Sequence, residues 1–169
     1  MQSQLSDYYL HIGIDTFIDM MPGKANNWHD TAPADGFSWQ SVALPNGKTG
    51  MRVYSGSYGK KINDAFHLCV KTLLNAGHNL IIDDVADGSR EVNIWLDELK
   101  NDSVFTVGLA CSITSLEQRE IARGYRTLGS SVEQYYRVHH GVKYDLMIDT
   151  DKLSTQEAAK KIVEVLQKY

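Results

Sequence analysis

Cysteine is scarce in this sequence of 169 residues, and there is no excess of positive charge. Cys69 and Cys111 each lie in an apolar run, which favours buried free thiols in a reducing compartment over a disulfide framework or a metal-ligand pair. The net charge of −4 argues against a general nucleic-acid or membrane-surface binder, because such a protein needs a basic face. No apolar run approaches the length of a transmembrane helix, and the N-terminal residues lack a signal-peptide pattern. These absences predict a cytoplasmic protein that binds neither nucleic acid nor membrane.

The sequence has enough apolar material for one continuous core, since apolar residues make up 43% and charged residues 22%. We therefore expect a single domain over residues 1–169. Four short, nearly continuous apolar runs have the character of strands covered on both faces, as in a parallel sheet. They span residues 8–14, 79–85, 103–111 and 142–149.

Helical patterns separate these runs. From Lys60 onward, apolar residues recur at helical spacing until Gly77, which predicts a C-terminal cap. Ser89 predicts the start of a second helix, and Ser154 with Glu157 forms a capping box before the last one. Strands that alternate with helices predict βαβ units and a layered α/β fold.

Segment 23–59 is rich in turn formers and polar residues, and a connection of this length is usually a functional loop, a lid or a binding insert. Its aromatic residues either offer a stacking surface to a ligand or fasten the loop to the body. They are Trp28, Phe37, Trp39, Tyr54 and Tyr58. Gly47-Lys48-Thr49 matches the end of a phosphate-binding P-loop, but Val42 stands where that pattern needs its first glycine. We expect a surface turn there.

Aspartates follow the first two apolar runs. Asp15 lies where a strand would end, so it is placed for a general base or a ligand contact; alternatively, its carboxylate caps a helix over residues 16–21. Asp83 and Asp84 resemble the acidic strand end that holds Mg²⁺ in phosphate-transferring folds, although one of them could serve only as a turn or cap residue. Two strands that end in aspartate in one sheet would open on the same crevice.

Arginines gather in the stretch "SLEQREIARGYRTLGSS". Ser115 with Gln118 predicts a helix start, and three arginines then follow at i, i+4 and i+7 on one face of a continuing helix: Arg119, Arg123 and Arg126. Such a row can clamp a polyphosphate, and Gly124 and Gly129 would let the segment move as a lid. The alternative is a solvated face on which arginines pair with Glu120 and its neighbours.

Four stretches in this order resemble the chloramphenicol phosphotransferase-like family, which comprises small P-loop kinases: "GIDTFIDMMP", "AGHNLIIDDV", "REIARGYRTLG" and "YDLMIDT". The resemblance runs from about Tyr8 to the C-terminus. It implies a three-layer α/β sandwich with a mainly parallel sheet, and ATP-dependent phosphorylation of a hydroxyl on a small molecule, with Mg²⁺. By resemblance Asp15 is the catalytic base, Asp83 and Asp84 are the metal ligands, and segment 23–59 shapes the acceptor pocket.

The resemblance also implies an arginine-rich lid over residues 114–131 that holds the ATP phosphates. Its matching arginines are Arg119, Arg123 and Arg126, the last two also assigned to catalysis. Asp149 and Thr150 match an element near the nucleotide base. The family usually has aspartate after the lid glycine, and this sequence has Tyr125.

One departure from the family is larger. The family begins with a strand and a glycine-rich P-loop, whereas this sequence begins at what resembles the end of the next helix. The lost strand would be central, between the strands expected at 79–85 and 103–111, and unpaired backbone groups there are costly. Either Met1 is an internal methionine of a longer kinase, or the chain is truncated or completed by another chain, or it is a degenerate relative.

The intact remaining motifs favour a longer kinase, and the chain as written is expected to be inactive. The alternative from a different class is a non-catalytic binding or assembly module, which would not bind ATP and would associate, as a homo-oligomer for example, to cover the exposed sheet. A dinucleotide-binding oxidoreductase is disfavoured, because no G-x-G-x-x-G turn follows any predicted strand.

Overall fold

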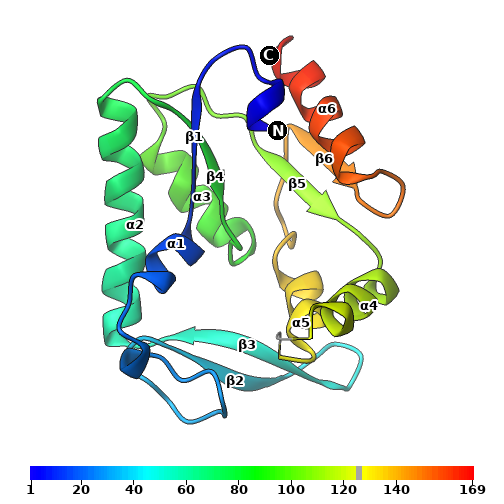
Figure 1. Ribbon diagram of the computed structural model, residues 1–169. Coiled ribbons are helices and arrows are strands. Elements are labelled where there is room, and N and C mark those ends of the chain that lie inside the picture. The colour runs from blue at the N-terminus through cyan, green and yellow to red at the C-terminus, as the bar shows by residue number, and fades with distance from the viewer. Residues whose placement is uncertain (125–126) are drawn as a thin grey trace. The chain divides into compact units, whose positions relative to one another are not determined.

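The computed structural model describes residues 1–124 and 127–169. The chain divides into two compact units, one formed by Asp7–Asp84 and the other by Met1–Ser6 together with Val85–Tyr169. Each unit contains one pair of parallel strands with helices around it (Figure 1). The described residues therefore form a mixed α/β protein with small, mainly parallel sheets, which confirms the predicted α/β class at that level.

The unit Asp7–Asp84 is built around the parallel pair of β1 and β4, which runs from Tyr9 opposite Asn79 to Gly13 opposite Asp83. Its elements in chain order are β1 (Tyr9–Gly13), α1 (Ile14–Asp19), the 3-10 turn η2 (Gly23–Ala25), β2 (Phe37–Ala43), β3 (Thr49–Ser55), α2 (Ser57–Asn75) and β4 (Asn79–Asp83). Both strands were predicted from their apolar runs, with bounds one or two residues wider.

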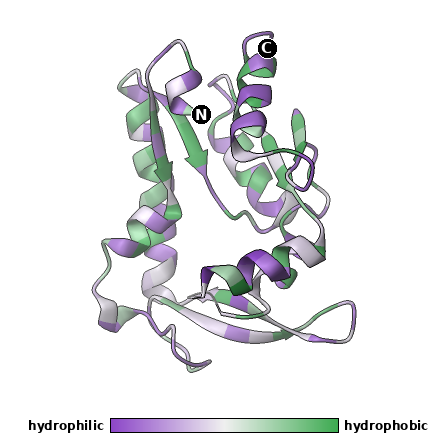
Figure 2. Cartoon of the chain, turned by 45° about the vertical axis from the view of Figure 1, so that its right-hand side comes forward, coloured by the Kyte–Doolittle hydropathy of each residue, from purple (hydrophilic) through white to green (hydrophobic). Residues whose placement is uncertain are grey.

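Helix α2 supplies much of the core of this unit. It is amphipathic, and hydrophobic and hydrophilic residues share its surface (Figure 2). Phe66 and Val70 are buried on it, and the ring of Phe66 lies 5.4 Å from that of Phe17 on α1. The helix ends at Asn75, and Gly77 follows with a φ of +86°, so the predicted glycine cap is confirmed.

Segment 23–59 contains a β-hairpin that the sequence analysis did not predict. Strands β2 and β3 pair antiparallel, from Phe37 opposite Ser55 to Ala43 opposite Thr49. Gly47 lies in the turn between them with a φ of +78°, and its N–H donates to the carbonyl of Leu44. The prediction of a surface turn at the Gly-Lys-Thr stretch is confirmed.

Three aromatic residues of this segment pack on one another. The ring of Trp28 stacks on that of Phe37 at 6.4 Å and meets Trp39 edge-on at 5.7 Å. These three rings therefore fasten the segment before the hairpin to β2. Tyr54 and Tyr58 keep 42% and 38% of their surface exposed.

The second unit is built around the parallel pair of β5 and β6, which runs from Val107 opposite Leu146 to Ala110 opposite Asp149. Its elements in chain order are the 3-10 turn η1 (Gln2–Gln4), α3 (Gly88–Glu98), β5 (Val107–Ala110), α4 (Ile113–Arg123), α5 (Ser130–Arg137), β6 (Leu146–Asp149) and α6 (Thr155–Leu166). Buried apolar side chains include Trp95, Leu99, Val132, Ile148 and Val163.

Helix starts in this unit agree with the sequence analysis at one place and differ at two. The predicted capping box of Ser154 and Glu157 is present at α6. Helix α3 begins at Gly88, one residue before Ser89. The predicted start at Ser115 is wrong: Ser112 leaves β5 in an extended conformation and accepts a hydrogen bond from the Ser115 N–H, so α4 begins earlier.

The expectation of a helix that continues through residue 126 is also wrong. Helix α4 ends at Arg123, and Gly124 adopts the left-handed conformation with a φ of +67°. A further helix, α5, starts at Ser130. Among the residues that the structure describes, none of the helices has the length and hydropathy of a membrane span.

Candidate functional site

Asp15 lies directly beyond the carboxyl end of β1. Helix α1 begins at Ile14 with Gly13 as its N-cap, so Asp15 falls within the first turn and makes no side-chain cap bond. The alternative that Asp15 caps a helix over residues 16–21 is therefore wrong. The carboxylate is exposed and makes no hydrogen bond or ion pair with any residue in the described part of the chain.

Asp83 and Asp15 leave the parallel pair at the same end. Gly13 at the end of β1 is paired with Asp83 at the end of β4, and a Cβ at Gly13 would come within 2.8 Å of the Asp83 carbonyl oxygen. Glycine therefore permits the two strands to close up there. The Asp83 side chain is 74% exposed, and one carboxylate oxygen lies 3.8 Å from Nε2 of His11. The predicted meeting of two acidic strand ends is present for this pair.

The chemistry of these carboxylates fits a magnesium ion in part. Mg²⁺ is commonly held by one or two carboxylates, with water and substrate phosphate completing its octahedron. Asp83 and the half-buried Asp84 have the oxygen atoms for such a contact. Within the described residues, no group of three or more His, Cys, Asp or Glu side chains is placed to hold a metal by itself. Ligand phosphate would have to contribute to binding.

The carboxyl end of the other strand pair is closed by internal contacts. Thr150 follows β6, and both its backbone N–H and its hydroxyl donate to the carbonyl of Ala110 on β5, at 2.7 and 3.0 Å. A carboxylate oxygen of Asp151 accepts from the backbone N–H of Ser112 at 2.8 Å. Hydrogen bonds from the Ser115 side chain and the Ser112 backbone hold the pKa of Asp151 below its usual value.

Asp149 is also engaged. Its carboxylate lies 2.7 Å from Nζ of Lys152 and accepts from the backbone N–H of Asp151 at 3.1 Å. The hydrogen bond from Lys152 is the main reason why the pKa of Asp149 lies below its ordinary value. Two residues predicted to bind the nucleotide, Asp149 and Thr150, thus form part of one polar network at the ends of β5 and β6.

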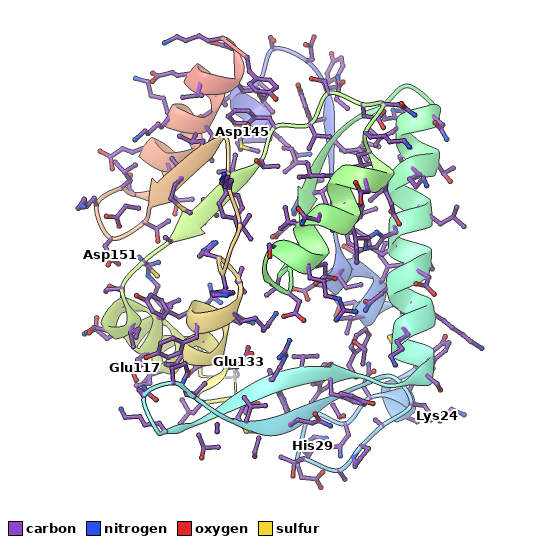
Figure 3. All side chains as sticks on the ribbon, turned by 180° about the vertical axis from the view of Figure 1, so that it is seen from behind. Lys24, His29, Glu117, Glu133, Asp145 and Asp151 are labelled. Atoms are coloured by element: carbon purple, nitrogen blue, oxygen red, sulfur yellow. The ribbon has the colours of Figure 1, made fainter. Side chains whose placement is uncertain are left out.

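Arg119 joins that network. Its Nη1 donates to the hydroxyl of Thr150 at 3.0 Å, and its Nη2 donates to the Thr150 carbonyl at 2.8 Å. A carboxylate oxygen of Asp151 lies 3.9 Å from Nη2 (Figure 3 labels Asp151). Arg119 and Thr150, which were both predicted to contact nucleotide, therefore contact each other and fasten α4 to the loop after β6.

The other predicted arginines are placed differently. Arg123 is the last residue of α4; its guanidinium is exposed and has no ion-pair or hydrogen-bond partner among the described residues. Arg126 and the neighbouring Tyr125 lie outside the described residues. The alternative pairing of arginines with Glu120 is wrong, because the Glu120 carboxylate accepts its hydrogen bonds from the start of α5.

One charged cluster was missed by the sequence analysis. Arg137 on α5 donates from Nε and Nη2 to the two carboxylate oxygens of Glu133, at 2.8 and 3.0 Å. Its Nη1 also reaches the carboxylate of Asp87, at 3.5 Å. Burial lowers the pKa of Arg137, but the contacts with Glu133 and Asp87 outweigh burial and leave that pKa raised. The signal available in the sequence was the i, i+4 spacing of glutamate and arginine in "SSVEQYYR".

The chain is thus a mixed α/β protein in which both parallel strand pairs end in aspartate, one exposed and one engaged in a polar network. It belongs to the chloramphenicol phosphotransferase-like protein family, whose profile matches residues 1–167. This match covers nearly the whole chain and confirms the resemblance carried by the four sequence stretches. No curated protein matches the chain.

Proposed function

We propose that this protein is a phosphotransferase that moves the γ-phosphoryl group of ATP to a hydroxyl on a small molecule. The observation that carries the proposal is the register of β1 and β4, which brings Asp15 and Asp83 out at one end of a parallel pair. Ligands of α/β proteins bind at such ends. Membership of a phosphotransferase-like family supports the same reaction class.

In this proposal Asp15 accepts or orients the proton of the attacking hydroxyl. Its exposed carboxylate has no competing internal partner among the described residues, which leaves both oxygens open to a ligand. Asp83 and Asp84 contribute carboxylate oxygens to Mg²⁺. The ion, when bound with ATP, supplies positive charge against the phosphate oxygens.

The arginine-bearing segment supplies the remaining positive charge. Arg123 presents an exposed guanidinium whose planar fork suits phosphate oxygens, and Arg126 is proposed to act with it. Arg119 uses two of its five N–H donors on Thr150, so a phosphate contact from it would have to use the others. Asp149 and Thr150 remain the proposed nucleotide-base side.

The hairpin segment 23–59 is proposed to shape the acceptor pocket, because it is the long insert of the same unit as Asp15. The acceptor class is a small molecule with a free hydroxyl. We also propose that the protein is located in the cytoplasm and that it has the three-layer sandwich fold of P-loop kinases.

A non-catalytic binding module is the second candidate function. It is favoured by the finding that Gly47-Lys48-Thr49 forms the turn of a hairpin, and by the internal use of Arg119. Both groups would otherwise be candidates for phosphate contact. This module would bind a partner or a small molecule without transferring phosphate, and homo-oligomerisation would be one form of such binding.

The two functions are separated by a transfer assay. Protein purified from its native cells is incubated with Mg²⁺, γ-³²P-ATP and a panel of hydroxyl compounds, and ATP affinity is measured by calorimetry on the same sample. We expect label in at least one acceptor, together with stoichiometric ADP. A sample that neither binds ATP nor labels any acceptor would contradict the phosphotransferase and favour the binding module.

A further inference from the structure

Glu120 is a buried carboxylate on α4 that holds the start of α5. Only 4% of its surface is exposed. Its Oε2 accepts from the backbone N–H of Gly129 at 2.8 Å, and its Oε1 accepts from the hydroxyl of Ser130 at 2.8 Å. Oε1 also accepts from the backbone N–H and the hydroxyl of Ser131, at 2.8 and 2.9 Å. Four donors therefore converge on a single side chain.

These contacts keep the carboxylate charged. Burial raises the pKa of Glu120, but the hydrogen bonds from Gly129, Ser130 and Ser131 lower it further, so that the pKa lies below the ordinary value of 4.5. The N-terminus of a helix carries partial positive charge, and Glu120 lies at the N-terminus of α5. Hydrogen bonds to an ionised acceptor are the stronger kind, so the carboxylate binds α5 tightly.

The residues between these contacts include the proposed phosphate-binding arginines. The connection between the two helices begins after Arg123, the last residue of α4, and ends at Gly129, which has a φ of +89°. Two large apolar side chains near its ends, Ile121 on α4 and Leu128 before Gly129, are each 66% exposed. Burial of these two side chains therefore does not hold α5 to α4, whereas Glu120 of α4 is bonded to Gly129, Ser130 and Ser131 at the start of α5.

We propose that Glu120 is a positioning residue whose carboxylate holds the start of α5 against α4, so that Arg123 at the end of α4 is presented to a polyphosphate ligand. The ligand class rests on the proposed function, whereas the geometry rests on the four hydrogen bonds. Substitution of Glu120 is then expected to weaken polyphosphate binding without removing any arginine.

The test compares Glu120→Gln with Glu117→Gln in the intact protein. Glu117 lies one turn earlier on α4 (Figure 3), so Glu117→Gln and Glu120→Gln remove the same charge from the same helix. The first readout is amide hydrogen exchange at Gly129 and Ser131, whose N–H groups donate to Glu120. The second is the Kd for inorganic tripolyphosphate, measured by calorimetry.

We expect Glu120→Gln to speed exchange at both amides and to raise the Kd by about tenfold, while Glu117→Gln matches the wild type. Ser130→Ala removes one donor and keeps the carboxylate, so it should shift both readouts in the same direction by less. This milder variant serves if Glu120→Gln does not fold.

Unchanged exchange at Gly129 and Ser131 in the Glu120 variant would show that the carboxylate does not hold the start of α5. Faster exchange with an unchanged Kd would overturn the positioning role. Wild-type protein that does not bind tripolyphosphate would contradict the proposed function, and the exchange rates alone would then decide whether Glu120 holds the start of α5.

Discussion

The ends of β4 and β6 are chemically alike and structurally different. Each strand closes a parallel pair with an aspartate, Asp83 in one unit and Asp149 in the other. The Asp83 side chain is 74% exposed, and one of its carboxylate oxygens lies 3.8 Å from Nε2 of His11. Asp149 instead receives the ammonium of Lys152 at 2.7 Å and a backbone N–H of Asp151.

The difference extends to the residues that follow each pair. Asp15 beyond β1 has no partner among the described residues, whereas Thr150 and Asp151 beyond β6 are bonded to Arg119 and Ser112. A charge that the fold itself satisfies contributes to stability, and an exposed charge at a strand end is open to a ligand. On this comparison we propose the chemistry at the β1–β4 end, whereas the contacts at the β5–β6 end hold α4.

The largest loss of stability is expected from Arg137→Ala in the engaged unit. Glu133 is 5% exposed, so removal of the guanidinium leaves a buried carboxylate without its bidentate partner. We expect the free energy of unfolding in urea to fall by about 3–5 kcal/mol. Arg90→Ala, at an exposed position on α3, is the control. Equal losses of stability in the two variants would contradict a stabilising role for the contact between Arg137 and Glu133.

The next largest effect is a pH dependence of the free energy of unfolding that arises from Glu120. Its pKa is lowered on folding, so its stabilisation is fully present above pH 4.5 and is lost as the pH falls through the folded pKa. Glu120→Gln should destabilise the protein by about 2 kcal/mol at pH 7. The difference in the free energy of unfolding between wild type and variant, measured by urea unfolding at each pH, should become smaller below pH 4.5. A gap that stays constant down to pH 3 would contradict an ionised buried carboxylate.

A smaller effect on stability is expected to distinguish Arg119 from Arg123, the two described arginines of α4. Arg119→Lys loses the forked contact with Thr150 and should cost about 1 kcal/mol of unfolding free energy. Arg123→Lys has no such contact to lose among the described residues and should stay within about 0.5 kcal/mol of the wild type. Thermal unfolding of both variants side by side measures the contrast, and the reverse order would mean that Arg119 is not a structural tie.

The smallest effect on stability is expected at the exposed strand end. Asp83→Asn removes a carboxylate that is 74% exposed, so the free energy of unfolding should change by less than about 0.5 kcal/mol. The Mg²⁺ concentration needed for half-maximal transfer should rise, because the proposed metal ligand loses its charge. A stability loss comparable to that of Arg119→Lys, with an unchanged Mg²⁺ requirement, would indicate that Asp83 stabilises the fold and does not bind the metal.

Sequence patterns predicted the features that depend on neighbours in the chain. The strand predicted over residues 8–14, the glycine after α2 and the capping box at Ser154 all follow from local composition and spacing, and all are present, the strand as Tyr9–Gly13. The hairpin of β2 and β3 was missed. Polar residues and a glycine interrupt the apolar positions of its strands, FSWQSVA and TGMRVYS, and the turn-forming residues around them favoured an irregular loop.

Contacts between distant residues could not be read from the sequence. Arg119 meets Thr150 across 31 positions, and no local spacing distinguishes this arginine from Arg123. Glu120 reaches Ser131 across 11 positions because α4 ends and the chain turns back, which the expectation of a continuous helix concealed. Tertiary contacts distinguish Arg119, which is bonded to Thr150, from Arg123, and the role of this stretch toward phosphate stays a prediction.

The most direct test of the central claim is the rate of phosphate transfer by Asp15→Asn against Asp19→Asn. Both aspartates are exposed residues of α1, so both substitutions should leave the free energy of unfolding unchanged. Loss of a general base predicts a fall of about 100-fold or more in kcat for Asp15→Asn, with a wild-type rate for Asp19→Asn. Undiminished transfer by Asp15→Asn would contradict the assignment of chemistry to this end of the strand pair.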